Sequence, residues 1–224
     1  MKEGFILINK PKGMASFGVV AYLRKITGIR KIGHAGTLDP LASGLLICAI
    51  GRSATKKIDI FLKQDKTYLA EIELGKVSDT YDAEGKIKKI NFKNKPTRKE
   101  IEKVLQMFIG EINQMPPIFS AKKIKGKKAY ELAREGKMVK LKKNKVKIYQ
   151  IKIIFYKFPF LKIKINCGSG TYIRSIAHDI GKKLKTGAVL TGLVRESIGK
   201  YSLKKSLELE KLDLEKIEKN IFKK

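Results

Sequence analysis

The sequence predicts an α+β domain built on a mixed, largely antiparallel sheet flanked by helices. Segments at 68–74, 146–155 and 161–165 alternate apolar and polar residues, which is typical of half-buried strands. Apolar residues at helical spacing occur between such segments, but strands and helices do not follow one another in regular βαβ units. We therefore expect a single domain over residues 1–224.

The first elements are a short strand and a helix. Phe5 and Leu7 suit a strand that ends near Pro11, because proline cannot donate to a strand ladder. Ser16 is placed to cap a helix with apolar residues at helical spacing, and Gly28 is placed to end it.

The later elements include two helices and a lysine-rich insertion. The residues from Thr97 to Glu100 form a capping-box pattern ahead of apolar residues at helical spacing, and the last dozen residues have the pattern of an amphipathic helix. The segment 114–140 is rich in lysine and has little continuous apolar pattern, apart from a possible short helix around Tyr130. We expect a mobile lobe or an arm that faces RNA, and a plain solvated loop is the alternative.

The charge of the chain favours a polyanionic partner. Lysine and arginine number 50 against 21 acidic residues, which gives a formal net charge of +29. Each lysine that neutralises a phosphate releases condensed counterions, so nucleic acid is the first partner to consider. A composition merely biased toward lysine is the alternative, and charge alone does not separate an enzyme from a binding protein.

Several protein classes are disfavoured. No stretch reaches the ~18 apolar residues of a membrane span, and the N-terminal apolar run is too short for a signal peptide. Cys48 and Cys167 lie in apolar contexts without the spacing of a zinc site or a disulfide framework. We expect a cytoplasmic protein with buried thiols, no metal site and no membrane partner.

The segment GHAGTLDPLASG at 33–44 places one carboxylate, Asp39, in a glycine-rich loop ahead of the apolar run Leu45–Ile50, which predicts a buried strand. Proline at position 40 restricts Asp39 to an extended or turn geometry. Gly33, Gly36 and Gly44 allow unusual backbone angles and a close approach of a partner. An ordinary Asp-Pro turn and a catalytic site are both compatible with this loop.

A second group of residues, GSGTYIR at 168–174, leads into another helical pattern. If Thr171 caps that helix, Arg174 lies in its first turns, where the helix dipole disfavours a cation. An anion must then compensate Arg174, either a phosphate or a carboxylate such as Asp39, and a surface arginine is the alternative. No Ser-His-Asp or Cys-His set and no phosphate-binding loop can be assembled, so nucleotide hydrolysis is disfavoured.

Taken together, these segments closely resemble the TruB family of tRNA pseudouridine synthases. The segment GHAGTLDPLASG at 33–44 and five further segments occur in family order. The five are INKPKGMAS at 8–16, DKTYLAEIELG at 65–75, SDTYDAEG at 78–85, PPIFSAKKIKGKKAYELAREG at 116–136 and GSGTYIRSIAHDIG at 168–181. The resemblance implies the pseudouridine-synthase catalytic fold with a central active-site cleft, and an RNA-clasping insertion at about 114–140. The chain ends where many relatives continue into a PUA domain, so none is expected.

The resemblance also implies roles for single residues. Asp39 matches the catalytic aspartate, Tyr68 the aromatic residue that stacks on the flipped uracil, and Arg174 the arginine that pairs with the aspartate. The other matched positions are expected to bind the substrate, line its pocket or support the active-site loop: His34, Lys10, Pro11, Tyr172, Leu193 and Lys123.

The implied reaction is isomerisation of the T-loop uridine at position 55 of tRNA to pseudouridine, by a monomer without a cofactor or protein partner. Asp39 could attack the ribose carbon, add to uracil C6 or remove a proton. The alternatives are a non-catalytic RNA-binding or ribosome-assembly protein on the same fold, and a pseudouridine synthase that acts on another RNA.

Overall fold

The computed structural model describes residues 2–120, 123–124, 127–128 and 141–224, which form two compact units. Unit 1 comprises Met1–Leu69 and Leu193–Lys224, and unit 2 comprises Ala70–Gly192. The boundaries between the units fall within strands β4 (Lys66–Leu74) and β12 (Ala188–Ile198). Both strands therefore contribute residues to both units.

Unit 1 is built around the predicted buried strand at 45–50, which is confirmed as part of β3. Its own strands are β1 (Gly4–Lys10), β2 (Ile32–Ala35), β3 (Ala42–Ile50), β13 (Tyr201–Ser202) and β14 (Leu207–Glu208). The strand order is β14-β1-β3-β12, with β2 paired to β3 and β13 to β12. β3 pairs antiparallel with β1 and β2 but parallel with β12, so the sheet is mixed, as predicted.

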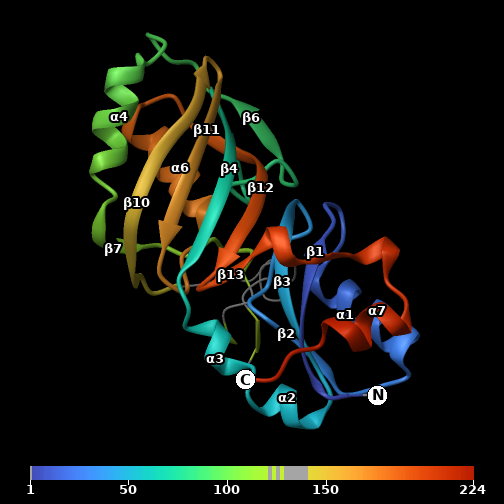
Figure 1. Ribbon diagram of the computed structural model, residues 1–224. Helices are drawn as coiled ribbons and strands as arrows, with labels where there is room; N and C mark the ends of the chain where they lie inside the picture. The colour runs from blue at the N-terminus through green and yellow to red at the C-terminus, as the bar shows by residue number, and fades with distance from the viewer. Residues whose placement is uncertain (1, 121–122, 125–126, 129–140) are drawn as a thin grey trace. The chain divides into compact units, whose positions relative to one another are not determined.

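Helices cover both faces of this sheet (Figure 1). On one face, α1 (Ser16–Thr27) and α7 (Leu214–Asn220) pack with apolar side chains of β1, β2 and β3 in a buried cluster. On the other face, α2 (Arg52–Lys56) and α3 (Asp59–Leu62) contribute Ala54 and Phe61 to a second cluster. Short 3₁₀ turns at Leu203–Lys205 and Leu209–Lys211 link β13, β14 and α7. β3 is therefore buried from both sides, which gives the loop before it a rigid base.

The ends of α1 differ in part from the sequence prediction. Gly28 does end the helix, with a left-handed φ of 70°. The N-cap residue is Ala15, however, and the side chain of Ser16 does not cap the helix. Its hydroxyl bonds instead to the backbone of Leu38, which lies 22 residues further along the chain. A tertiary partner has replaced the local one that the sequence pattern suggested.

Unit 2 contains two of the alternating segments that predicted strands, 146–155 and 161–165, and most of the third, which lies in β4. Its strands are β5 (Lys76–Ser78), β6 (Ile87–Lys89), β7 (Gly110–Gln114), β8 (Lys123–Ile124), β9 (Lys127–Lys128), β10 (Asn144–Lys157) and β11 (Phe160–Cys167). The main order is β12-β4-β11-β10-β7, and β5-β6 and β8-β9 form separate pairs. β10 pairs antiparallel with both β7 and β11.

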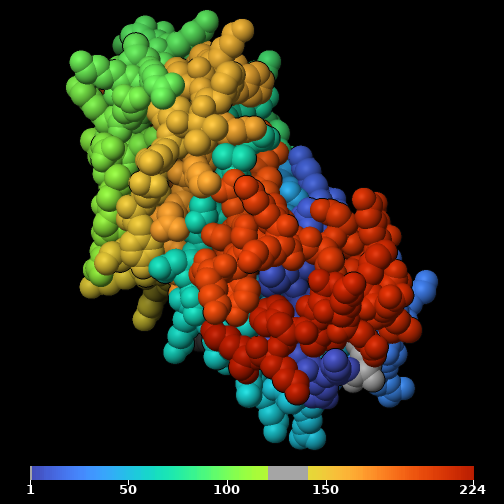
Figure 2. Space-filling model, viewed as in Figure 1, coloured from blue at the N-terminus to red at the C-terminus, as the bar shows by residue number. Residues whose placement is uncertain are grey.

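Two helices of unit 2 pack against each other, and α4 also packs against β10: α4 (Arg98–Gln106) and α6 (Ile173–Lys183). The predicted capping box of α4 is confirmed, since Thr97 and Glu100 satisfy each other's backbone N–H groups. β10 and β11, yellow to orange in Figure 2, are visible at the surface of this unit and expose apolar side chains at Ile154, Phe155 and Phe160. The helix predicted around Tyr130 lies outside the described residues.

Gly44 is required by the parallel pairing of β3 with β12. Its φ is +104°, and a Cβ atom there would lie 2.5 Å from the carbonyl oxygen of Arg195 and 2.7 Å from its nitrogen. The close partner expected for this glycine is thus the backbone of a neighbouring strand. Gly36 also has a positive φ, of +78°, whereas Gly33 lies inside β2 and is not among the positive-φ residues.

We predict that Gly44→Ala destabilises unit 1 by about 3 kcal/mol, because strain at a positive φ adds to overpacking against backbone atoms that cannot rotate away. Urea unfolding followed by circular dichroism measures this loss. Gly13→Ala is the matched control, since Gly13 has a φ of +86° but its Cβ would meet nothing within 4 Å. Equal losses for the two variants would contradict the packing argument.

Candidate active site

Asp39 lies in the loop between β2 and β3, and the loop backbone is fixed directly before and after it. Leu38 donates its N–H to Ser16 Oγ at 2.8 Å, and its carbonyl accepts from the same hydroxyl at 2.9 Å. The Asp39 carbonyl accepts from the N–H of Ala42 at 3.0 Å, which closes a turn into β3. The side chain of Asp39 is half-buried. The carboxylate thus sits on a backbone with little freedom to move.

Lys10 is the last residue of β1, and Pro11 begins the turn that meets the Asp39 loop. The fully buried ammonium group of Lys10 donates to the carbonyls of Pro11 and Met14, at 2.9 and 2.5 Å, and so fixes the turn after the strand. The N–H of Gly13, inside that turn, donates to the carbonyl of Pro40 at 2.8 Å. A direct contact of Lys10 or Pro11 with substrate stays a prediction.

Arg195 ties the two ends of the Asp39 loop together, and the sequence prediction missed it. Its Nε donates to the carbonyl of Leu45 at 2.8 Å and its Nη2 to the carbonyl of Gly36 at 3.0 Å. Only 1% of Arg195 is exposed. An arginine directly after the apolar pair Leu193 and Val194 in β12 is the signal that could have revealed it, because a buried cation needs acceptors.

His34 lies in β2 opposite Cys48 of β3. Burial lowers the pKa of His34, and the positive charge of Arg195 lowers that pKa further. Within the described part of the chain, its Nδ1 atom is buried without a hydrogen-bond partner. Burial also raises the pKa of the Cys48 thiol to about 12, so this cysteine is not a nucleophile at neutral pH. His34 is therefore a neutral group suited to contact rather than to carry charge.

Tyr68 and Leu193 are both buried in unit 1, with 7% and 8% exposure. Tyr68 lies in β4, two residues after Lys66, whose ammonium group donates to the carbonyls of Leu62 and Gln64. Leu193 pairs in register with Ala42, the first residue of β3 after the Asp39 turn. The register therefore places Leu193 beside the end of the loop, and its contact with the substrate stays a prediction.

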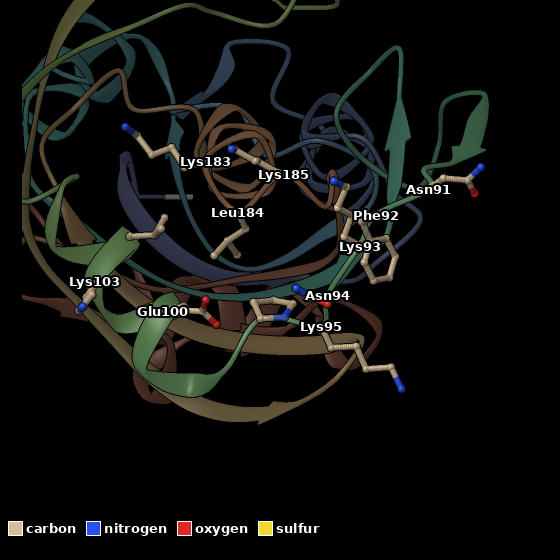
Figure 3. A pocket seen from close by; sticks show the side chains of 12 residues that line it. Asn91, Phe92, Lys93, Asn94, Lys95, Glu100, Lys103, Lys183, Leu184 and Lys185 are labelled. Atoms are coloured by element: carbon tan, nitrogen blue, oxygen red, sulfur yellow. The ribbon is translucent and has the colours of Figure 1, made fainter.

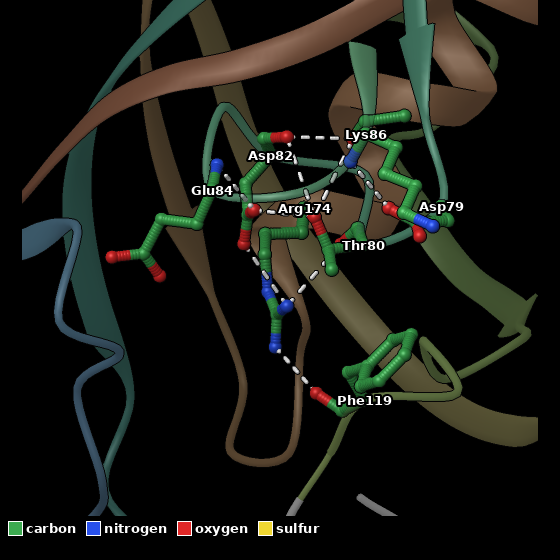
Figure 4. Close-up of polar contacts among 8 residues, drawn as sticks. Asp79, Thr80, Asp82, Glu84, Lys86, Phe119 and Arg174 are labelled. Carbon is green, nitrogen blue, oxygen red and sulfur yellow. Dashed lines mark hydrogen bonds and ion pairs between the residues drawn. The ribbon is translucent and has the colours of Figure 1, made fainter. Parts of the chain in front are cut away.

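Arg174 lies in the first turn of α6, as predicted, and it is 6% exposed. Its Nη1 donates to Asp82 Oδ2 at 3.0 Å and to the carbonyl of Thr80 at 3.2 Å, while Nη2 donates to the carbonyl of Phe119 at 3.0 Å (Figure 4). These acceptors hold the guanidinium plane in one orientation. Its expected contact with Asp39 joins residues of different units and stays a prediction.

Asp82, within the SDTYDAEG segment, is the second residue that the sequence prediction did not assign. Its side chain is 2% exposed and forms an ion pair with Arg174. Its other oxygen accepts from Thr80 Oγ1 at 2.6 Å and from the N–H of Glu84 at 3.1 Å. Tyr81, at a positive φ of 67°, stacks on His178 one turn along α6 from Arg174, with ring centroids 4.0 Å apart. Loop 80–82 and α6 are thus locked together.

Tyr172 is the N-cap residue of α6, so the prediction that Thr171 caps this helix is wrong. Thr171 instead donates its hydroxyl to the carbonyl of Gly168 at 2.8 Å. Gln114, buried at the end of β7, accepts from the N–H of Tyr172 at 2.8 Å and donates to its carbonyl at 3.0 Å. The start of α6 is therefore fixed by a side chain from a distant strand.

Unit 1 holds six of the predicted site residues: Asp39, Tyr68, His34, Lys10, Pro11 and Leu193. Unit 2 holds Arg174, Tyr172 and Lys123, and only the backbone of Lys123 is described, in β8. Most of the predicted insertion at 114–140 lies outside the described residues.

Over the ranges that are described, no helix is long and apolar enough to cross a membrane, and no group of three or more histidine, cysteine, aspartate or glutamate residues could hold a metal ion.

We predict that Ser16→Ala loosens the Asp39 loop and lowers kcat about tenfold, because both backbone groups of Leu38 lose their buried partner. Unfolding stability should fall by about 2 kcal/mol for the same reason. Single-turnover rates and urea unfolding measure the two effects. Ser206→Ala removes a comparable bond, from its hydroxyl to the carbonyl of Leu203 at 2.6 Å, outside this loop. A Ser16→Ala variant as active as that control would contradict the role of Ser16.

Solved structures share this fold. The structure of an H/ACA RNP bound to a substrate RNA containing 2′-deoxyuridine matches 93% of the chain with a TM-score of 0.70 and 27% identity. A Cbf5-Nop10-Gar1 complex matches 93% with a TM-score of 0.71 and 28% identity. The chain spans about half the length of those chains, 52% and 53%. The α+β pseudouridine-synthase fold predicted from the sequence is thereby confirmed.

The family follows from the sequence comparisons. The family model described as TruB family pseudouridylate synthase (N terminal domain) matches residues 24–173. The tRNA pseudouridine synthase B of Protochlamydia amoebophila is 48% identical over 206 residues, which cover 92% of this chain and 78% of the relative. The protein of that name from Clostridium acetobutylicum is 45% identical over 98% of this chain and 75% of the relative. The chain belongs to the TruB family of pseudouridylate synthases.

Proposed function

We propose that the protein isomerises a uridine of tRNA to pseudouridine, at position 55 in the T loop. One observation carries the proposal: the carboxylate of Asp39 sits on a loop whose backbone is fixed by Ser16, by the turn that Lys10 shapes and by Arg195. A structural turn needs no such buried support on every side. Relatives that cover almost the whole chain are named tRNA pseudouridine synthase B, which supports the same substrate class.

The proposed reaction breaks one bond and forms another without a redox change. The bond between ribose C1′ and uracil N1 breaks, the base rotates, and C1′ joins C5. The hydrogen on C5 leaves as a proton, and N1 ends with a proton. We propose that Asp39 acts in its ionised form at this centre, because a neighbouring cation favours a carboxylate over its neutral acid. The proposed cation is Arg174, which would also orient the carboxylate.

The target base must leave its stack before it can react, at a cost of a few kcal/mol. We propose that stacking on Tyr68 returns about 1–3 kcal/mol of this cost.

Lys10 and Pro11 would contribute through the turn after β1 that meets the Asp39 loop, and Leu193 through its place beside the start of β3. His34, Tyr172 and Lys123 would contact the RNA, and the insertion at 114–140 would clasp it. We also propose that the protein is a cytoplasmic monomer with a single catalytic domain and that it requires no protein partner.

Purified protein incubated with unmodified tRNA and with an isolated T stem-loop tests this function. Carbodiimide mapping should find one pseudouridine, at the T-loop uridine, in both RNAs. Product in full-length tRNA at another position would instead favour a different substrate site. RNA binding without product in either RNA would favour the alternative of a non-catalytic RNA-binding protein.

A further inference from the structure

A lysine-lined hollow in unit 2 lies apart from the site residues named above. It has a volume of about 680 Å³, and it is formed by the segment 91–96, the first turns of α4 and the end of α6. Five lysines are arranged around the hollow in Figure 3. Lys183 ends α6 and Lys185 follows that helix, Lys93 and Lys95 lie in the segment before α4, and Lys103 lies in α4. All five of these lysine side chains are exposed.

Two carboxylates partly offset these lysines. Among the described residues, Glu100 is the one acidic residue in the lining; it accepts from the Thr97 N–H at 2.6 Å and from Thr97 Oγ1 at 2.7 Å, and it interacts electrostatically with Lys103. Asp179 interacts electrostatically with Lys183. The ammonium groups of Lys93 and Lys185 make no hydrogen bond or ion pair with other residues that the structure describes, so the five lysines still outnumber the two carboxylates. A hollow with this surplus of positive charge concentrates anions.

Two of the cations are held by aromatic rings. The ammonium group of Lys95 lies 5.6 Å from the ring centroid of Phe158, which packs on Phe92 in the lining, and that of Lys183 lies 5.9 Å from the centroid of Phe108. Such contacts restrict a flexible lysine while leaving its charge in place. Asn91 and Asn94 add amide donors at the rim. Ammonium and amide donors together suit phosphate oxygens.

The hollow and Arg174 lie at opposite ends of one rigid helix. Arg174 is in the first turn of α6 and Lys183 is its last residue, nine positions later. At ~1.5 Å per residue the two are about 13 Å apart along the helix axis. A duplex strand carries a phosphate roughly every 3.4 Å, so this distance corresponds to roughly four phosphates. One RNA molecule can therefore reach both ends of α6.

We propose that this hollow binds backbone phosphates of the substrate RNA outside the loop that carries the target uridine. The inference rests on the proposed function for its RNA, but not on the roles of Asp39 or Arg174. The hollow would strengthen RNA binding and take no part in the chemical step. Loss of its charge should raise KM and leave kcat unchanged.

A triple variant that removes three charges from the hollow tests the proposal: Lys93→Gln/Lys103→Gln/Lys185→Gln. Its control removes three exposed lysines from unit 1 instead: Lys204→Gln/Lys205→Gln/Lys219→Gln. Affinity for unmodified full-length tRNA is measured by filter retention over a range of salt concentrations. We expect about tenfold weaker binding at low salt for the first variant. The slope of log K against log salt should become shallower by about 2, since each lost phosphate contact removes ~0.7–0.9.

Equal affinity and equal slope for the two variants would overturn the proposal. Circular dichroism confirms that both variants fold, and wild-type isomerisation of the isolated T stem-loop is measured in parallel. If wild type forms no pseudouridine, the proposed function fails. If wild type is active and the two variants bind alike, only this inference fails.

Discussion

Asp39→Asn is expected to abolish isomerisation, with a rate at least ~10³-fold below wild type, or about 4 kcal/mol of lost transition-state stabilisation. The amide keeps the size and shape of the side chain but can neither act as a nucleophile nor take up a proton. Binding of tRNA should change less than about twofold, because the loop backbone is held by groups other than this side chain. Single-turnover mapping and filter retention measure the two quantities.

The matched control for this variant is Asp59→Asn, which removes the same charge from an exposed position in the first turn of α3. It should modify tRNA at the wild-type rate. Full modification by Asp39→Asn, or equal losses in both variants, would contradict a role for the Asp39 carboxylate in the chemistry.

Asp82→Asn should produce the second large effect. The substitution breaks a buried ion pair in which the two side chains are only 7% and 2% exposed. Removing one member of a buried ion pair costs about 3–5 kcal/mol of stability. The substitution should also lower kcat by about 10²-fold, because the guanidinium group of Arg174 can then move by about an ångström. The change in KM should be smaller, since Asp82 positions Arg174 and does not itself contact the substrate.

Asp79→Asn is the control for Asp82, because Asp79 lies in the same loop, is exposed, and accepts from the N–H of Lys86 at 2.8 Å without touching Arg174. Wild type, Asp82→Asn, Arg174→Lys and the variant with both substitutions form a double-mutant cycle. If the pair acts as a unit, the double variant should lose no more activity than Arg174→Lys alone. Additive losses, or a normal kcat for folded Asp82→Asn, would refute the positioning role.

The sequence predicts elements whose signals are local. Three such elements are confirmed: the capping box at Thr97, the end of α1 at Gly28 and the buried strand at 45–50. Each depends on neighbours within a few positions. Alternating apolar residues likewise predict β10 and β11, because burial of one face requires that period.

The missed residues have partners far away in the chain. Arg174 meets Asp82 across 92 positions, and Arg195 meets Leu45 across 150. A buried arginine signals that acceptors exist, but the sequence does not reveal which ones. Ser16 shows the opposite error, since a residue with a strong local preference for capping binds a loop 22 positions away instead. The family resemblance implies a catalytic role for Asp39, while the reason for its fixed position is visible only in three dimensions.

The central claim is that Asp39 drives isomerisation of a single uridine in the T loop. Joining C1′ to C5 expels the hydrogen of C5, so a T stem-loop labelled with [5-³H]uridine reports the reaction as tritium released into water. This role of Asp39 predicts that wild type releases the tritium of one uridine per RNA, matched by the same amount of pseudouridine, and that Asp39→Asn releases none. Absence of release by wild type, or equal release by Asp39→Asn, would contradict it.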